Sequence, residues 1–424
     1  MSLTLIIVFA LLFLLGVPLA ISMGISVVAT MLIFDIPLHS LTQNIMSSMN
    51  SFLLVAVPLF VLAGSIMAGG GLSDRIFSAA QAVLGRYRGG LGYVNVTASA
   101  VFGGISGSSV ADVVGLGKIQ IKAMTEHNYP RSYAAALTMV TSILSSVVPP
   151  SILMIIAASA AGVSVAGALA GGLGPAVVII GALMILNYIV SARNKYGNVT
   201  RTRFKKGLRT VLGSVPALGG PVVILAGMFG GAFTPTEAAA IAVFYSLFVG
   251  ALVYRDLKWR EMPRMLIDAG LTSGTILFIA MTASAATYIF TIDGLPMRVS
   301  NWMLSVTTNP IGVMLLMGLV LIAIGAVMDV VAAILLTVPV LMPAALSAGI
   351  DPIHFVVFLV TALSIGLVTP PVGVALFATS YVSKLPIETI VKAAVPQYAL
   401  LLVVVAILAV FPDLVLWPAR LLDG

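Results

Sequence analysis

The stretch Gly103-Gly104-Ile105-Ser106-Gly107-Ser108-Ser109-Val110-Ala111-Asp112 carries glycine, serine and an acid between two strongly apolar segments. In a bilayer, irregular backbone is tolerated only where it is buried in protein or lines a wet cavity. We therefore interpret this stretch as the tip of a re-entrant helical hairpin, where freed backbone groups and hydroxyls hold an ion or a polar solute. A flexible Gly/Ser loop between two complete spans is the alternative.

The composition is that of a polytopic membrane protein. Of 424 residues, 60% are hydrophobic and 8% are charged, with a mean hydropathy of +1.16; soluble domains carry about 25% charged residues. At roughly 20 residues per span there is room for about ten spans. The apolar run from Leu5 lacks a basic flank and a cleavage site, so we expect a retained helix. The absence of cysteine excludes disulfides and thiolate chemistry.

Two short arms flank the tip, in a predicted hairpin over about 91–124. Each arm has about a dozen residues, or roughly 20 Å at 1.5 Å per residue, and ~30 Å of hydrocarbon is more than this. Basic residues stand on both flanks: Arg86, Arg88, Lys118, Lys122 and Arg131. Because cytoplasmic segments collect Lys and Arg, we expect the hairpin to enter from the cytoplasm. Two tilted full spans with an external turn remain the alternative.

The next long apolar segment, about 132–161, contains Pro149-Pro150 near its middle. Proline removes a backbone donor and clashes with the preceding turn. This sequence predicts a discontinuous helix with exposed carbonyls beside the hydroxyls of Ser145, Ser146 and Ser151. A simple kink is the structural alternative.

Charged segments set the topology. The run Arg193–Arg209 contains seven basic residues and no acid, which places it in the cytoplasm and accounts for much of the net charge of +7. Nucleic-acid binding is therefore not indicated. Thr234-Pro235-Thr236-Glu237 predicts a helix start with Thr234 as N-cap. The mixed-charge segment Arg255–Arg264 is expected at the cytoplasmic surface, between two halves of the chain.

The second half repeats the first. Corresponding features lie 217, 221, 221 and 218 residues apart: Asp112 and Asp329, Pro149-Pro150 and Pro370-Pro371, Pro175 and Pro396, Leu59-Phe60 and Leu277-Phe278. The second hairpin, about 311–346, has its tip at Gly325–Asp329 and flanks poor in Lys and Arg. We therefore expect it to enter from outside, which makes the two repeats inverted.

These patterns predict an all-α polytopic membrane protein with two inverted repeats. The predicted units are N-terminal scaffold helices (1–49), repeat 1 (50–190), a basic loop with scaffold helices and an amphipathic linker (191–264), repeat 2 (265–412) and a C-terminal tail (413–424). Repeat 2 includes a second broken helix, about 355–381. Inverted repeats with discontinuous helices are typical of secondary transporters, whose sites lie near mid-membrane.

The chain resembles the large membrane (M) subunit of TRAP transporters along nearly its whole length. The residues that carry the resemblance are Gly-Gly-Ile-Ser-Gly-Ser at 103–108, Gly-Gly-Ala-Phe-Thr-Pro-Thr-Glu-Ala-Ala at 230–239, and the two Pro-Pro breaks. The resemblance implies a sodium-driven, elevator-type importer of carboxylate-bearing solutes, such as dicarboxylates or sialic acid, in the bacterial inner membrane. It also implies two partners, a periplasmic substrate-binding protein and a small four-helix membrane subunit, expected here as a separate chain.

Two sodium sites follow from the resemblance, each between a hairpin tip and a helix break. The expected residues are Gly104, Ser106, Ser108, Ser145 and Pro149 for the first, and Gly325, Met328, Gly366, Thr369 and Pro370 for the second. Many would bind through backbone carbonyls, because oxygen ligands suit a hard cation. Alternatively, the glycines and prolines only shape the hairpins.

The expected substrate contacts are Ser108, Ser164 and Asp329. An ionisable residue at membrane depth is a functional candidate, although Asp329 and Asp112 can also be explained as helix caps. No Lys or Arg is placed at mid-depth, so helix N-termini and hydroxyls must receive a carboxylate. Sodium is the expected coupling ion, and no other cofactor is indicated.

Four other functions are less well supported by the sequence. Proton coupling through Asp112, Asp329 or Glu237 is the nearest rival, and a stand-alone sodium- or proton-coupled anion symporter of the same wider fold is the alternative function. A channel is disfavoured because inverted hairpins predict saturable transport. An enzyme is not indicated, because His39, His127 and His354 are scattered near predicted water interfaces and form no metal-binding pattern.

Overall fold

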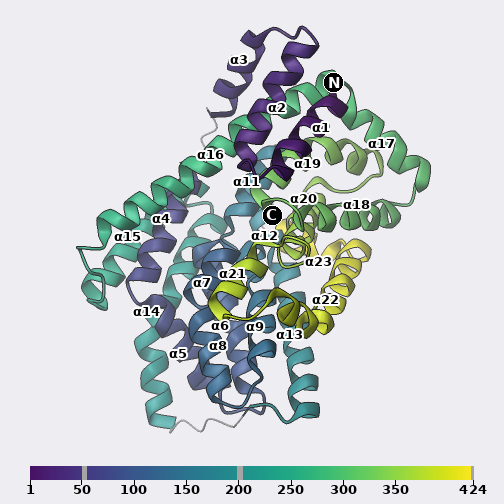
Figure 1. Ribbon diagram of the computed structural model, residues 1–424. Coiled ribbons are helices and arrows are strands. Elements are labelled where there is room, and N and C mark those ends of the chain that lie inside the picture. Colours follow the sequence, from purple (N-terminus) through teal and green to yellow (C-terminus); the bar gives the residue numbers. More distant parts are fainter. Residues whose placement is uncertain (50–54, 198–203, 422–424) are drawn as a thin grey trace.

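The computed structural model describes residues 1–49, 55–197 and 204–421, and these ranges contain helices and no β-strand (Figure 1). Within these ranges, six helices are long and apolar enough to cross a membrane, or up to eight if each bent helix pair counts as one span. The basic segment Arg193–Arg209 includes the end of α13 (Leu173–Asn194) and the start of α14 (Phe204–Phe229). Its Arg201 and Arg203 lie outside the described residues.

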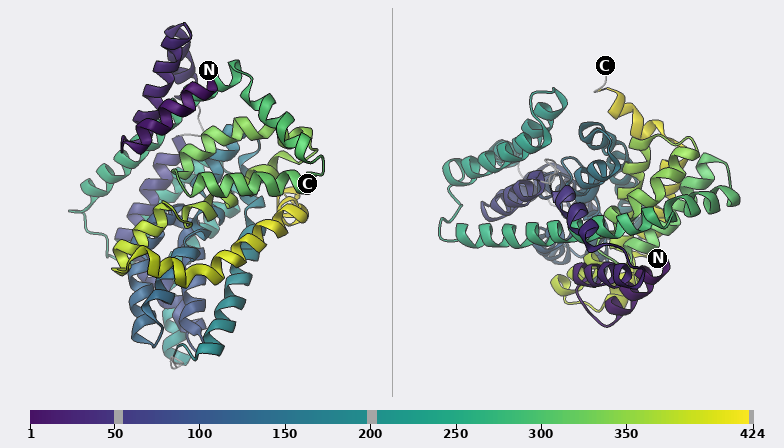
Figure 2. Two further views of the ribbon diagram at one scale, coloured as in Figure 1. Left: turned by 45° about the vertical axis from the view of Figure 1, so that its right-hand side comes forward. Right: turned by 90° about the horizontal axis from the view of Figure 1, so that it is seen from above.

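An outer group of helices comes from the N-terminal and middle parts of the chain. Its members are α1 (Ser2–Leu14), α2 (Leu19–Ile33), α3 (Leu38–Met49), α4 (Ala56–Gly69), α5 (Leu72–Leu84), α14 (Phe204–Phe229), α15 (Pro235–Phe248, continued by a π-helix at Val249–Val253) and α16 (Met262–Ile292). Helix α4 packs on α15, and α5 on α14, while α16 packs on α2, α3 and α4. Seen from above, α16 extends across much of the molecule (Figure 2).

An inner group contains the remaining helices. Its members are α6 (Gly90–Ser106), α7 (Ser109–Gly115), α8 (Gly117–Glu126), α9 (Arg131–Thr141), α10 (Leu144–Val147), α11 (Ile152–Ala161), α12 (Val165–Gly171), α13 (Leu173–Asn194), α17 (Leu295–Val306), α18 (Pro310–Gly325), α19 (Val330–Ser347), α20 (Pro352–Leu367), α21 (Val374–Ser383), α22 (Ile387–Val410) and α23 (Asp413–Arg420). Halves of the chain interleave here, because α11 packs on α19 and α20 while α9 packs on α22.

The first hairpin consists of α6, a two-residue turn, and α7 followed by α8. The turn is shorter than the Gly/Ser stretch suggested, since α6 continues through Ser106 and only Gly107 and Ser108 leave the helix. Gly107 has a φ of +59°, a left-handed conformation that glycine adopts without steric cost. The second hairpin joins α18 to α19 through residues 326–329.

Both Pro-Pro pairs lie in helix breaks. The helical segment Arg131–Val147 and α11 are bent by 45° at residues 148–151, and α20 is separated from α21 by residues 368–373. The Pro149–Pro150 and Pro370–Pro371 peptide bonds are both cis. These observations leave the inverted-repeat organisation and its unit boundaries as predictions.

Helix α20 lies in the middle of the inner group. Every residue from His354 to Leu367 is buried, as expected of a helix that is apolar on all sides. His354, predicted near a water interface, is instead buried with its Nε2 2.8 Å from the carbonyl oxygen of Leu408. The imidazole thereby gives the buried carbonyl of Leu408 a hydrogen-bond partner in a place without access to water.

Two local predictions need correction. The apolar segments 5–21 and 25–36 predict two short helices with a break around Pro18 and Gly24; the break lies at residues 15–18, and α2 runs through Gly24 with helical backbone bonds. Residues 74–88, whose Arg75, Arg86 and Arg88 predict a cytoplasmic loop, are largely helical, because α5 has apolar residues on one face and polar residues on the other. The unit 413–424 contains α23, whose Val415 and Leu416 are buried. In contrast, Thr234 and Glu237 form the predicted capping box.

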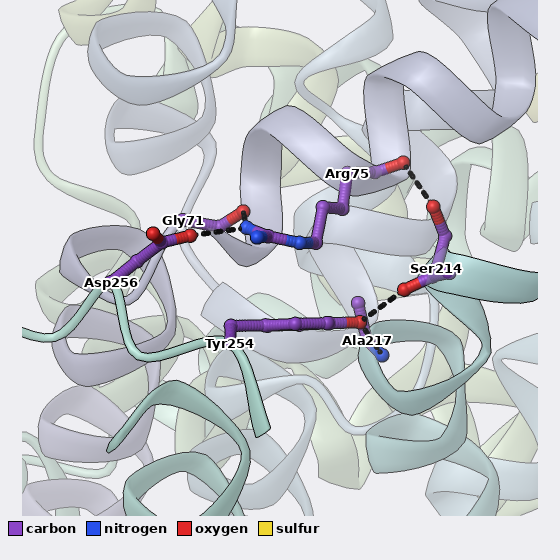
Figure 3. A network of polar contacts seen from close by, with 7 residues as sticks. Gly71, Arg75, Ser214, Ala217, Tyr254 and Asp256 are labelled. Carbon is purple, nitrogen blue, oxygen red and sulfur yellow. Dashed lines mark hydrogen bonds and ion pairs between the residues drawn. The ribbon is translucent and has the colours of Figure 1, made fainter. Parts of the chain in front are cut away.

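A polar network fixes the elbow between α4 and α5, which are bent by 67° at Gly70 and Gly71 (Figure 3). The Arg75 Nη1 donates to Asp256 Oδ2 at 2.5 Å and to the Gly71 carbonyl at 3.1 Å. Its guanidinium lies 3.8 Å from the ring centroid of Tyr254, and the Ser214 hydroxyl donates to the Arg75 carbonyl. Arg75 therefore joins the start of α5 to the 254–256 segment through its side chain and to α14 through its backbone carbonyl.

Candidate functional site

A cavity of about 660 Å³ lies where both hairpin tips and both helix breaks meet the outer helices α4 and α16. Its lining residues come from six places: Val61, Gly64, Ser65 and Ala68 of α4; Phe102, Ser106, Gly107, Ser108, Ser109, Val110, Ala111 and Val114 around the first tip; Ser146, Ile152 and Leu153 at the first break; Asp329, Val330 and Val331 at the second tip; Leu367 and Val374 at the second break; Thr272, Thr275, Ile276 and Ile279 of α16.

The serines of the first tip face the first break. Ser109 Oγ lies 2.9 Å from Ser146 Oγ, while Ser108 caps α7 by accepting a hydrogen bond from the backbone N–H of Ala111. Ser106 and Ser145 are buried, and neither hydroxyl has a hydrogen-bond partner within the described part of the chain. Buried hydroxyls are ordinarily satisfied, so these two oxygens are available to a ligand.

Backbone meets backbone at the first site because glycines leave room. A Cβ on Gly103 would lie 2.6 Å from Cα of Ser145, and one on Gly104 would lie 2.9 Å from the carbonyl oxygen of Pro149. Four of the five predicted residues of sodium site 1, Gly104, Ser106, Ser145 and Pro149, thus lie at the contact between tip and break. Ser108 lies at the turn and faces the cavity.

The second site is built in the same way. A Cβ on Gly366 would lie 2.6 Å from the carbonyl carbon of Gly325. The Ala326 carbonyl accepts hydrogen bonds of 3.0 Å from the N–H groups of Val372 and Gly373, which ties the second tip to the second break.

The other predicted residues of sodium site 2 lie on these two segments. Met328 is partly buried at the tip. Thr369 and Pro370 stand in the break, where the Thr369 hydroxyl donates to the Ile365 carbonyl at 2.7 Å. The structure thus joins Gly325 to Gly366 directly and places Met328, Thr369 and Pro370 beside them along the chain.

The predicted substrate contacts separate into two places. Ser108 and Asp329 both line the cavity. Ser164 does not: it is exposed, and its hydroxyl caps α12 by accepting from the N–H of Gly167. Ser164 thus lies outside this cavity. Asp329 is the N-cap of α19 and accepts from the N–H of Val331 at 2.9 Å.

Four helices begin at the cavity. The lining includes residues from the first turns of α7, α11, α19 and α21, and no Lys or Arg is among the lining residues that the structure describes. Helix N-termini carry partial positive charge and unpaired N–H groups. Ser108, Ser151 and Asp329 already cap α7, α11 and α19, so an anion would meet the N–H groups that these caps leave free. Hydroxyl and carbonyl oxygens nearby suit a cation.

Sequence reasoning missed part of this site. Gly103 and Ser146 could have been found from the sequence, because each lies next to a predicted residue of the same type, Gly104 and Ser145. Thr272 and Thr275 of α16 have none, because they stand in an ordinary-looking span. Only the packing of α16 beside the second hairpin brings them to the cavity.

The fold and this cavity define a multi-pass helical transporter of the membrane. The chain belongs to the DctM component family of the tripartite ATP-independent periplasmic (TRAP) transporters, whose family model matches residues 6–414. It is thus a large permease subunit of the bacterial inner membrane and not an enzyme.

Three curated relatives match this chain over about nine-tenths of their length. The sialic acid TRAP transporter large permease protein SiaM of Vibrio cholerae is 34% identical, with 90% of each chain covered. The C4-dicarboxylate TRAP transporter large permease protein DctM of Pseudomonas aeruginosa is 35% identical, with 92% of each chain covered. The 2,3-diketo-L-gulonate TRAP transporter large permease protein YiaN of Escherichia coli is 34% identical, with 91% covered.

Two solved structures share the fold at low identity. The YdaH transporter of Alcanivorax borkumensis has a TM-score of 0.59 at 15% identity, with 89% of this chain and 88% of that chain covered. MtrF of Neisseria gonorrhoeae has a TM-score of 0.55 at 14% identity, with 88% and 83% covered. At such identity the likeness concerns the fold alone.

Proposed function

We propose that this chain is the transport subunit of a sodium-driven importer for a carboxylate-bearing solute. The observation that carries this proposal is the convergence of four helix N-termini on one cavity, with no Lys or Arg among the described residues that line it. Backbone N–H groups then receive the carboxylate, and the hydroxyls of Ser106, Ser108 and Ser109 contact the polar remainder of the solute.

Sodium is the coupling ion in this proposal. Two places offer oxygen atoms beside glycine contacts: the tip of the first hairpin against Ser145 and Pro149, and the tip of the second against Gly366 and Thr369. The unpartnered hydroxyls of Ser106 and Ser145 support the first. A cation at each tip draws tip and break together, and its charge offsets that of the solute.

Solute delivery and alternating access complete the proposal. Curated relatives are named for sialic acid and C4-dicarboxylate transport, which supports a carboxylate as the transported group. We propose that a periplasmic binding protein delivers the solute and that a small membrane subunit completes the permease. The inner helices then slide against the outer helices as an elevator, since the cavity lies between the two groups.

The test is uptake into proteoliposomes that contain this chain, the small membrane subunit and the binding protein. A panel of radiolabelled sialic acid and C4-dicarboxylates is offered with an inward sodium gradient, and again without one at the same pH. We expect accumulation of one panel member only with the gradient. Accumulation driven equally well by a proton gradient in sodium-free buffer would refute sodium coupling.

The stand-alone symporter is the second candidate, and the same preparation distinguishes it. Proteoliposomes with this chain alone should not accumulate solute under the proposed three-component mechanism. Uptake by the single chain at the rate of the complete system would establish the symporter instead.

A further inference from the structure

A group of buried polar side chains lies within the first hairpin and between it and α9, and none of them lines the cavity. Asn95 of α6 donates from Nδ2 to the hydroxyl of Thr138 at 2.7 Å, and the hydroxyl of Thr141 donates to Asn95 Oδ1 at 2.8 Å. All three side chains are 0% exposed. The polar atoms of Asn95, Thr138 and Thr141 are thus hydrogen-bonded, and such a network holds its side chains in fixed positions.

Gln120 of α8 extends the group toward the tip. Its Nε2 donates to the carbonyl oxygen of Asn95 at 3.3 Å and to the hydroxyl of Ser99 at 3.1 Å. Because a carbonyl can only accept, this pair of contacts fixes the orientation of the amide. Oε1 of Gln120 is buried and has no donor within the described ranges.

Asp112 of α7 completes the group. It is 1% exposed, and neither carboxylate oxygen has a hydrogen-bond donor at ordinary distance among the residues that the structure describes. The Ser99 hydroxyl is the neighbouring polar side chain, although it makes no hydrogen bond of ordinary geometry to the carboxylate. Ser99 thus stands between Asp112 and Gln120, and both carboxylate oxygens and Oε1 of Gln120 have no hydrogen-bond partner among the described residues.

Helix capping does not account for Asp112. The N-cap of α7 is Ser108, whereas Asp112 stands inside the first turn. Its counterpart in the second hairpin, Asp329, is a true N-cap with a bonded oxygen. The two acids therefore have different roles, although the sequence presents them alike.

The hairpin architecture does not require a polar interior either. Helix α18, the first arm of the second hairpin, has no polar or charged side chain from Ile311 to Gly325. Its Val313, Met317 and Leu321 are buried and apolar, whereas α6 buries Asn95 and Ser99. One hairpin thus folds on apolar packing, and the polar interior of the other needs a separate reason.

We propose that Asp112, Ser99 and Gln120 bind a sodium ion inside the first hairpin, at a position separate from the two sites at the tips. This inference rests on the proposed function in taking sodium as the coupling ion. A buried carboxyl group is neutralised either by a proton or by a cation beside it. No Lys, Arg or His of the described chain forms an ion pair with Asp112, and in this proposal sodium is the neutralising cation.

The ligand set selects a monovalent ion. It consists of oxygen atoms only, which suits a hard cation, and its single carboxylate balances one positive charge. No group of three or more His, Cys, Asp and Glu occurs in the described chain, so a divalent site is not supported. Ser99 precedes Ser106 by seven residues on α6, which separates this position from the tip by about 10 Å.

The test counts sodium ions. Equilibrium binding of ²²Na⁺ is measured on the complex of this chain with its small membrane subunit in nanodiscs, for wild type and Asp112→Asn. Asparagine keeps the shape of the side chain and removes its charge. We expect Asp112→Asn to bind one sodium ion fewer per chain than wild type. Thr361→Val is the matched control: Thr361 is equally buried and bonded only to its own helix at Val357, and it should bind the wild-type number.

A second variant covers the case in which Asp112→Asn does not fold. Ser99→Ala retains the carboxylate and removes one ligand, and we expect one class of sodium ions to bind at least tenfold more weakly. If Asp112→Asn, or Ser99→Ala in its place, binds sodium like wild type, the proposed site does not exist. If wild type itself binds no sodium, the proposed function fails, so the two failures are distinguishable.

Discussion

Gly103→Ala perturbs the contact between the first tip and the first helix break with one methyl group. The added Cβ would lie 2.6 Å from Cα, 2.8 Å from N and 2.8 Å from Oγ of Ser145. Ordinary contacts begin at 3.4 Å, so α6 and α10 must separate by about 1 Å. Two of the three atoms belong to backbone, and rotation of a side chain cannot relieve the clash.

The energetic consequence has two parts. Overpacking of this kind costs about 1–3 kcal/mol, which exceeds the ~0.5–1 kcal/mol that alanine gains over glycine in a helix. The same movement displaces Ser145, a predicted sodium ligand. If the loss of sodium binding free energy reaches ~1.4 kcal/mol, the sodium affinity falls tenfold. We therefore expect a lower thermal stability and at least a tenfold higher sodium concentration for half-maximal uptake.

The assay is thermal unfolding of the purified chain across a sodium titration, followed by uptake in proteoliposomes. Gly115→Ala is the matched control, because it lies in the same hairpin and its Cβ would find only Phe102, at 3.8 Å. We expect Gly115→Ala to keep the sodium response of wild type. A Gly103→Ala protein with wild-type stability and sodium response would refute the argument that this contact forms a sodium site.

Three further changes test other parts of the structure. Asp329→Asn keeps an equally good N-cap, so the free energy of unfolding should change by only about a few tenths of a kcal/mol. The variant loses the charge at the cavity, and uptake should fall about tenfold. Thr234→Ala removes half of a capping box and should lower the free energy of unfolding by about 1 kcal/mol, with uptake per folded molecule unchanged. Arg75→Lys loses the stacking on Tyr254 and should cost about 1 kcal/mol, measured by thermal unfolding of the purified chain.

The parts of the fold predictable from sequence are those in which a residue type dictates backbone geometry. Adjacent prolines cannot continue a helix, and both pairs lie in breaks. Thr234 and Glu237 cap a helix through their own side chains, so the local sequence sufficed. Gly24 misled because a glycine inside an apolar helix weakens it without ending it.

The cavity was only partly predictable, because its walls come from distant segments. Ser108 and Asp329 carry a signal in their own tips, but Thr272 and Thr275 become lining residues only through packing. Ser164 is a serine like the residues of the tip, but its side chain caps α12. Asp112 was not distinguishable from Asp329 by the repeat spacing, because their roles depend on where each helix begins: Asp329 caps α19, whereas Asp112 stands inside the first turn of α7.

The Arg75 network bears on how far the first hairpin can travel. Helix α5 is held at its N-terminal end by Asp256 and the Gly71 carbonyl, and along its side by α14. Only residues 85–89 then connect this anchored rod to the start of α6. At roughly 3.3–3.6 Å per extended residue, this linker keeps the start of α6 within about 20 Å of the end of α5, and the proposed elevator motion must stay inside that reach.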